Sequence, residues 1–150
     1  MQYKNNQSVL VVIHALDTGR VLMLQRQDDV DFWQSITGTI ETGETPRQTA
    51  LREVFEEVGL KISEKSTALV DCQHSVEFEI FPQFRYKYAP DVTHCRENWF
   101  LLAVEQEFVA RLTEHLAYQW LAPEQAAELT KSWNNREAIV RYLVARKDPQ

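Results

Sequence analysis

Three glutamates have the spacing that places their carboxylates on one face of an α-helix. Glu53, Glu56 and Glu57 occupy relative positions 0, +3 and +4. Like charges at these separations oppose helix formation by roughly a few tenths of a kcal/mol per pair, so stability alone would favour a lysine. A divalent cation explains the cluster, because Mg²⁺ binds carboxylate oxygens together with phosphate oxygens and water. The alternative is a solvated acidic face, which three clustered carboxylates alone do not exclude.

The helix that must carry these glutamates is predicted to cover residues 46–58. Thr45 is a suitable N-cap, Pro46 fits the first helical position, and Gln48 completes a capping box with Thr45. Gly59 stands where a left-handed residue ends a helix. The apolar side chains recur every four residues, at Ala50, Val54 and Val58. Arg52 lies four residues before Glu56 and could orient it by a charge-assisted hydrogen bond.

Extended segments surround this helix on both sides in the sequence. Apolar or alternating patterns predict strands at 8–16, 20–26, 33–37, 67–81, 84–88, 98–105 and 117–121. A turn at 17–19 makes the first two strands a hairpin. Pro123 begins a short helix, and residues 135–146 form an amphipathic terminal helix. Strands before and after one central helix favour an α/β fold, a sandwich with a mixed central sheet.

Composition fits a single globular domain over residues 1–150, with 44% hydrophobic and 25% charged residues. A net charge of −6 argues against nucleic-acid polymers, which need a dense basic surface, but permits a small phosphorylated substrate. We see no signal peptide and no apolar run near the ~18 residues of a membrane span. Cys72 and Cys95 are isolated, which favours reduced thiols and a cytoplasmic protein.

The segment 38–60 resembles the sequence motif of the Nudix hydrolase family, the Nudix box. All its fixed positions are filled, by Gly38, Glu44, Arg52, Glu53, Val54, Glu56, Glu57, Gly59 and Leu60. A chance match in a chain of this size has a probability on the order of 10⁻⁷. The resemblance implies an α/β/α Nudix fold and Mg²⁺-dependent hydrolysis of a phosphoanhydride bond, with Mn²⁺ as a possible substitute. It also implies that Glu53, Glu56 and Glu57 bind the metal and that Gly38 lends a backbone carbonyl.

The remaining segments resemble one branch of this family, the bacterial dihydroneopterin triphosphate pyrophosphatases. The segments are WQSITGTIETGET, DCQHSVEFEIF, RYKYAPDVTHCRENWF, EHLAYQWL and LTKSWNNREAI. They imply cleavage of dihydroneopterin triphosphate to the monophosphate and pyrophosphate, a step of folate synthesis. His74 and Ser75 depart from the pattern, which has a more basic residue there. The alternative substrate is a purine (deoxy)nucleoside triphosphate, as in nucleotide-pool cleansing. A non-catalytic nucleotide sensor is disfavoured, because such domains usually lose the glutamates of the box.

The same resemblance suggests roles for residues outside the box. Glu114 is the candidate for a fourth carboxylate facing the box helix, as a metal ligand or general base, and Glu56 is the other candidate base. The adjacent His115 is interpreted as structural. Arg26 and Lys4 could bind phosphate, and Thr37 could donate a hydrogen bond to substrate. Each of these side chains could instead be an ordinary surface or strand residue.

A predicted strand and a serine complete the set of candidate substrate contacts. Phe78, Ile80 and Phe81 could stack on a flat ring, while Glu79 could accept hydrogen bonds from a ring N–H and an amino group. The alternative is a strand that alternates between core phenylalanine and exposed glutamate. Ser132 could contact substrate or cap the last helix.

Overall fold

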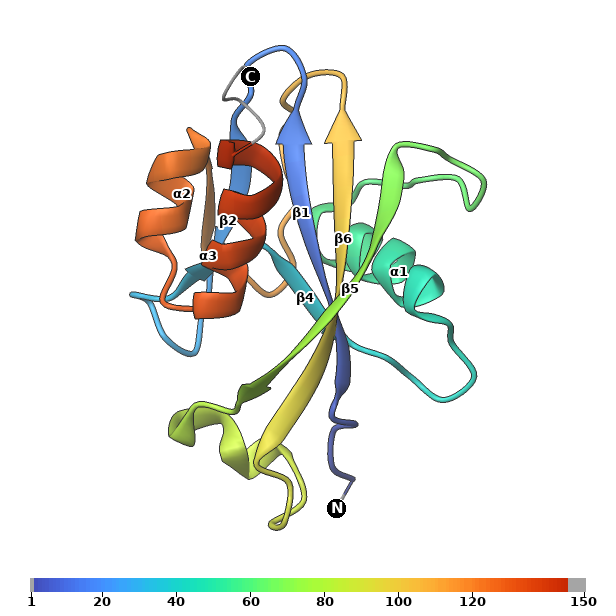
Figure 1. Ribbon diagram of the computed structural model, residues 1–150, viewed down its shortest axis with the longest axis vertical. Helices are drawn as coiled ribbons and strands as arrows, with labels where there is room; N and C mark the ends of the chain where they lie inside the picture. The colour runs from blue at the N-terminus through green and yellow to red at the C-terminus, as the bar shows by residue number, and fades with distance from the viewer. Residues whose placement is uncertain (1, 146–150) are drawn as a thin grey trace.

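Strand β1 (Gln7–Ala15) lies in the middle of a seven-stranded sheet in the computed structural model, which describes residues 2–145 (Figure 1). It pairs in parallel with β6 (His94–Val104) along one edge. On its other edge it pairs antiparallel with β2 (Val21–Gln25) and β4 (Ile36–Thr39). The predicted hairpin and mixed sheet are therefore confirmed. The remaining strands are β3 (Trp33–Gln34), β5 (Leu69–Glu79) and β7 (Ala117–Leu121).

Helices cover both faces of this sheet. Side chains of a strand alternate between faces, so both the odd and the even residues of β1 must be apolar if both faces are covered. Val9, Val11 and Ile13 pack on the side of α1 (Pro46–Val58). Leu10 and Val12 pack on the other side, with apolar residues of the two C-terminal helices. Figure 1 shows these layers, with α2 (Pro123–Leu129) and α3 (Trp133–Ile139) opposite α1. The predicted α/β/α sandwich is confirmed.

Helix α1 has the predicted boundaries and caps. The side chain of Thr45 accepts a hydrogen bond from the backbone N–H of Gln48, and the Gln48 side chain accepts one from the backbone N–H of Thr45. Gly59 ends the helix in the left-handed region, at φ 79°. The apolar stripe of Ala50, Val54 and Val58 is buried against the sheet. Local sequence therefore fixes the helix, and core packing fixes which face remains for the glutamates.

Two predicted segments differ from the structure. Residues 84–88 were expected to be extended, but residues Pro82–Lys87 form a 3₁₀ helix, η1. Pro82 occupies the start of this helix, where its fixed φ suits a helical turn. The predicted strand 33–37 is divided between β3 and β4, and the backbone N–H of the intervening Ser35 donates to Oδ1 of Asn135.

Other boundaries shift by a few residues. β6 begins at His94, four residues before the predicted start at 98. The terminal helix begins at Trp133, because Ser132 caps it by accepting a hydrogen bond from the backbone N–H of Asn135. It continues as a π-helical turn, η2 (Val140–Val144), and its predicted end at 146 lies outside the described residues.

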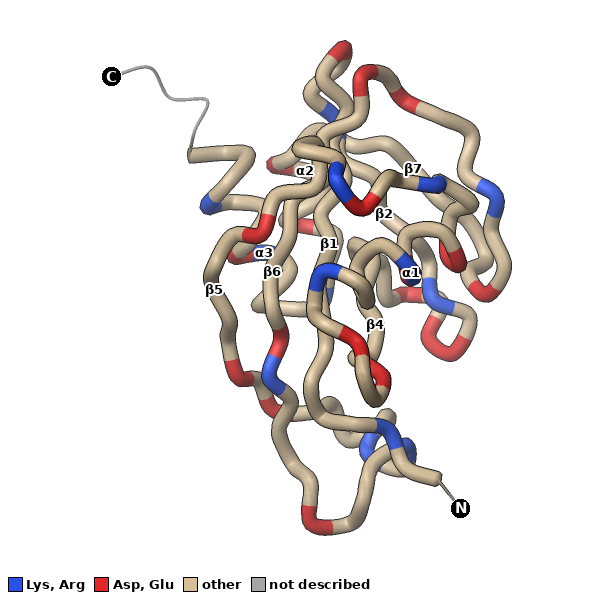
Figure 2. Tube along the Cα trace, turned by 90° about the vertical axis from the view of Figure 1, so that its right-hand side faces the viewer, with Lys and Arg blue, Asp and Glu red and all other residues tan. Residues whose placement is uncertain are grey.

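Charges of both signs are interspersed along the chain (Figure 2). The basic residues of the N-terminal segment and of η1 lie close together, and the backbone N–H of Lys4 donates to the Lys87 carbonyl at 2.9 Å. Among residues 2–145, no helix is both long enough and apolar enough to cross a membrane.

Candidate active site

The guanidinium of Arg52 joins three carboxylates of the segment 38–60. It donates two hydrogen bonds to Glu44, at 2.7 and 2.9 Å, and one each to Glu53 at 2.9 Å and Glu56 at 3.1 Å. It also donates to the backbone carbonyl of Thr39 in β4, at 3.0 Å. Hydrogen bonds donated to Glu44 lower its pKa to about 2, and those from Arg52 have the largest effect. The predicted Arg52–Glu56 contact is confirmed as one part of a larger network.

Glu57 receives no hydrogen bond from Arg52. It is only 5% exposed, and its Oε1 has no hydrogen-bond partner among the described residues. Nε2 of His115 is 3.7 Å away, but burial lowers the pKa of His115 to about 4, so the ring is neutral near pH 7. Burial, a hydrogen bond with Glu53 and repulsion from nearby carboxylates raise the pKa of Glu57 well above its ordinary value. This buried carboxylate is short of positive charge, so the donor set fits a hard divalent cation.

The four predicted metal ligands, Glu53, Glu56, Glu57 and Glu114, line one opening, but their carboxylates do not converge on a single point. Glu114 lines the same opening as the box glutamates, and its charge contributes to the raised pKa of Glu57. Glu56 is 54% exposed and turned toward Arg52. Among the described residues, no group of three His, Cys, Asp or Glu side chains is gathered closely enough to hold a metal as it stands. Because these are long, flexible side chains bearing like charges, a cation would have to draw them together.

Gly38 is in close contact with one of these carboxylates. A Cβ on Gly38 would overlap the Cγ, Cδ and Oε2 atoms of Glu53. Because Gly38 has no side chain, the Glu53 carboxylate can lie directly against the backbone of β4. This close approach explains, in steric terms, why the motif has glycine at this position.

The carboxylates line a wide opening that leads into a smaller cavity. The opening has a volume of about 510 Å³ and the inner cavity about 130 Å³. Both are lined by the same seven residues at their junction, which are Lys4, Arg26, Gln34, Thr37, Gly38, Thr39 and Lys87. The predicted contacts Lys4, Arg26 and Thr37 are thus brought together at one place.

Three cations at this junction come from distant parts of the chain. Burial, followed by repulsion from Lys87 and Arg26, lowers the pKa of Lys4. Arg26 pairs with Asp28 at 2.7 Å and stacks over the Phe84 ring at 4.2 Å from its centroid. The sequence-based prediction missed Lys87, because a strand at 84–88 gave no reason for this side chain to turn toward the N-terminal segment.

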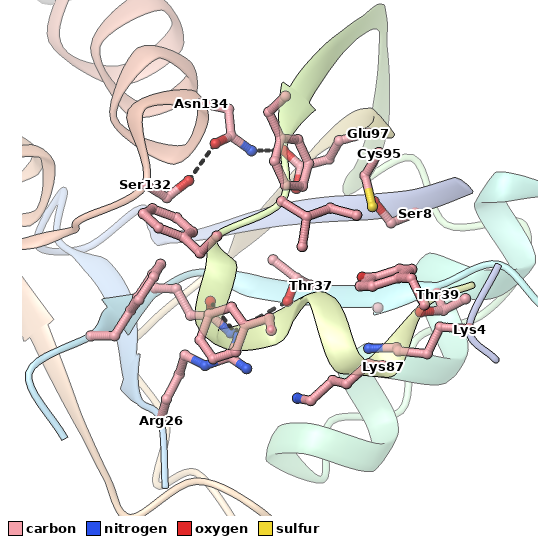
Figure 3. Close-up of a pocket in the computed structure, with 18 residues that line it drawn as sticks. Lys4, Ser8, Arg26, Thr37, Thr39, Lys87, Cys95, Glu97, Ser132 and Asn134 are labelled. Carbon is pink, nitrogen blue, oxygen red and sulfur yellow. Dashed lines mark hydrogen bonds between the residues drawn. The ribbon is translucent and has the colours of Figure 1, made fainter. Parts of the chain in front are cut away.

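The inner cavity has an aromatic wall (Figure 3). Phe78, Ile80 and Phe81 line it as predicted. Phe84, which was not predicted, also lines the cavity, and its ring lies edge to face with that of Phe81 at 6.2 Å between centroids. Glu79 does not reach the cavity. It is exposed and stands opposite His94 on the other face of β5, whereas Phe78 pairs with an inward residue of β6.

A different carboxylate, Glu97, lies at the closed end of the cavity. It is 3% exposed and accepts hydrogen bonds from the indole Nε1–H of Trp99 at 3.1 Å and from Nδ2 of Asn134. Burial raises the pKa of Glu97 to about 7, and these hydrogen bonds lower it in part. The sequence does contain a signal: Glu97 occupies an inward position of β6 between the buried residues Cys95 and Trp99. Ser132 also lines this end and, as predicted in one alternative, caps α3.

Comparison with known proteins agrees with this arrangement. The Nudix domain family matches residues 4–143, and the chain therefore belongs to the Nudix family, whose hydrolases generally need a divalent metal. It is 68% identical to the dihydroneopterin triphosphate diphosphatase of Haemophilus influenzae, over 95% of this chain and 90% of that protein. It is 56% identical to the enzyme of the same name from Escherichia coli strain K12, over 95% of each chain.

The fold agrees equally well with a solved structure. The E. coli dihydroneopterin triphosphate pyrophosphohydrolase superposes with a TM-score of 0.93 at 54% sequence identity. The match covers 97% of this chain and 99% of that one. At this identity and coverage, the relatives share the whole sandwich and not only the box.

The contact between Gly38 and Glu53 gives a first prediction. Gly38→Ala should displace the Glu53 carboxylate. The kcat for hydrolysis of the triphosphate substrate should then fall by about 100-fold, since small misplacements of catalytic groups have effects of this size. Gly19→Ala is the control, because a Cβ there meets no atom within 4 Å and its positive φ costs only stability. Turnover and thermal unfolding of both variants are measured together. Equal activity of the Gly38 variant and wild type would contradict the steric argument.

Burial of Glu97 gives a second prediction, on stability against pH. Its pKa rises from 4.5 to about 7 on folding, so between these values the folded state holds a proton that the unfolded state releases. The free energy of unfolding of the wild type should therefore fall, relative to Glu97→Gln, by up to about 3 kcal/mol as pH rises from 4 to 8. Urea unfolding of both proteins across this range measures the difference. A constant difference would show that Glu97 ionises normally.

Proposed function

We propose that this chain is a diphosphatase that hydrolyses dihydroneopterin triphosphate to dihydroneopterin monophosphate and pyrophosphate. The observation that carries the proposal is near full-length identity of 68% and 56% to two relatives that bear this name. The cavity supports it independently. An opening lined by carboxylates and cations suits a metal-bound triphosphate, and the aromatic inner cavity suits a flat ring.

The carboxylates of the opening are proposed to hold Mg²⁺, with Mn²⁺ as a substitute. Glu53 and Glu57 would be the principal ligands, joined by Glu56 or Glu114. When bound, such a cation neutralises phosphate charge and increases the acidity of a bound water. Arg52 holds Glu53 in place, so the ligands stay on the side of α1 that faces the opening. The unpartnered oxygen of Glu57 is the main support for this assignment.

The cations of the junction are proposed to bind the triphosphate. Lys4, Arg26 and Lys87 stand between the carboxylates and the aromatic wall. The phosphate nearest the ring must lie here if the ring is in the inner cavity and the outer phosphates are at the carboxylates. A water molecule then attacks phosphorus, pyrophosphate leaves, and a carboxylate accepts the proton of the water. Glu56 and Glu114 are both candidates for this base, because both line the opening and are exposed enough to exchange protons with solvent.

The ring of the substrate is proposed to occupy the inner cavity. Phe78 and Phe81 provide apolar surface on which a pterin can stack, and Ile80 completes this wall. Ser132 lies at the far end of the same cavity, and Thr37 lies at the junction. We also propose that the enzyme acts in the cytoplasm, where the free thiols of Cys72 and Cys95 would stay reduced.

The metal site gives a third prediction. Glu57→Gln keeps the shape of the side chain but removes the charge that a hard cation requires, so kcat should fall on the order of 10³-fold with the fold retained. Glu64→Gln, an exposed position outside the opening, should behave as wild type. Chelation should abolish wild-type activity, and added Mg²⁺ should restore it. Near-normal turnover of the Glu57 variant at saturating Mg²⁺ would place the metal elsewhere.

Substrate choice gives a fourth prediction. All candidate substrates share the triphosphate, so discrimination must arise from the ring and its contacts with the inner cavity. We expect kcat/KM for dihydroneopterin triphosphate to exceed the values for dGTP and dATP, measured as pyrophosphate release. A dNTP preferred over the pterin by tenfold or more would instead favour the alternative function, nucleotide-pool cleansing, with the same phosphoanhydride chemistry.

A further inference from the structure

The closed end of the inner cavity contains a hydrogen-bonded chain with a fixed direction. The hydroxyl of Ser132 accepts from the backbone N–H of Asn135, and its own proton is donated to Oδ1 of Asn134. The Asn134 amide is thereby oriented with its NH₂ group toward Glu97, where it donates to Oε1. Trp99 donates to the same oxygen. Figure 3 shows Ser132, Asn134 and Glu97 in this order.

The two oxygens of Glu97 have very different surroundings. Oε1 accepts both protein hydrogen bonds, whereas no described residue donates to Oε2. Glu97 lines the cavity although it is 3% exposed, so Oε2 is the oxygen available to a ligand. A carboxylate oxygen that faces a cavity without a protein donor can accept a hydrogen bond from a ligand N–H that enters the cavity.

We infer that Glu97 determines ring specificity, its Oε2 accepting a hydrogen bond from the N–H edge of a 2-amino-4-oxopyrimidine ring. This ring type occurs in both pterins and guanine, where a ring N–H stands beside an exocyclic amino group. The inference rests on the proposed function, which supplies the triphosphate and directs the ring into the inner cavity. Glu97 takes the part that the sequence suggested for Glu79, which lies on the opposite face of β5.

The chemistry disfavours rings with the opposite edge. Adenine presents a ring nitrogen lone pair beside its amino group, so one of its two edge groups would face the carboxylate with like polarity. Both hydrogen bonds that described residues make with Glu97 are donated to the glutamate, so it meets these neighbours as an acceptor. A site built in this way discriminates more strongly than an apolar pocket, because the wrong ring leaves a buried polar group unpaired.

Glu97→Gln tests this inference because it reverses the polarity of one atom. Asn134 and Trp99 both require an acceptor at the Oε1 position, so the glutamine carbonyl must stay there and its NH₂ group must face the cavity. We expect kcat/KM for dihydroneopterin triphosphate and for dGTP to fall by about 100-fold, with dATP changed by less than about threefold. Inorganic triphosphate, which has no ring, should inhibit the variant and wild type equally.

The matched control is Glu77→Gln, on the strand that carries Phe78. The Glu77 side chain is 61% exposed, and it pairs with Arg96 at 3.5 Å on the surface. The same change of charge there should leave all three kcat/KM values as in wild type. An equal loss of activity toward all three substrates in Glu97→Gln would overturn the inference, as would an unchanged preference for dGTP over dATP.

A ligand-side experiment covers the case in which the Glu97 variant does not fold. Wild-type enzyme is assayed with dGTP and with 1-methyl-dGTP, which lacks the ring N–H. A decrease in kcat/KM of about tenfold or more is expected, and equal turnover would overturn the inference. Failure of the proposed function has a separate signature, a tenfold preference of the wild type for a dNTP over the pterin. The dependence of the dGTP-to-dATP ratio on Glu97 would still be measurable in that case.

Discussion

The repulsion between carboxylates on one face of α1 is the constraint on which the site depends. A single guanidinium, that of Arg52, balances Glu44, Glu53 and Glu56. Glu57 is buried beside them with a neutral histidine as its nearest basic group. The protein thus supplies less positive charge than this face requires, and a cation brought with the substrate would supply the remainder.

The rest of the fold serves to place this face next to a cavity of different chemistry. Strand β4 carries Gly38 against Glu53 and, on the same short segment, Thr37 at the mouth of the inner cavity. Strand β6 lies beside β1 in the sheet. Its side chains alternate between the two faces, and Glu97 is on the face that α3 covers. Phosphate chemistry and ring recognition therefore lie on opposite faces of the same sheet, joined where β4 ends.

Local sequence was enough to predict the first of these two parts. The capping box, the glycine at 59 and the positions of the glutamates act within a few residues of one another, so their geometry follows from helix periodicity alone. The junction and the ring end depend on contacts between distant segments. Lys4 meets Lys87 only because η1 is a 3₁₀ helix, and Glu97 meets Asn134 only because α3 packs over β6. The strand register, which periodicity does not specify, decides that Phe78 and not Glu79 faces inward.

The central claim is that one molecule occupies both parts of the site at once, with its phosphates at the carboxylates and its ring at Glu97. The most direct measurement is a crystal structure with Mg²⁺ and an α,β-methylene analogue of dihydroneopterin triphosphate, which resists hydrolysis. We predict the metal on Glu53 and Glu57, the ring against Phe78 and Phe81, and a ring N–H within hydrogen-bond distance of Glu97 Oε2. A ring bound outside the inner cavity, or a metal bound away from Glu57, would contradict the account.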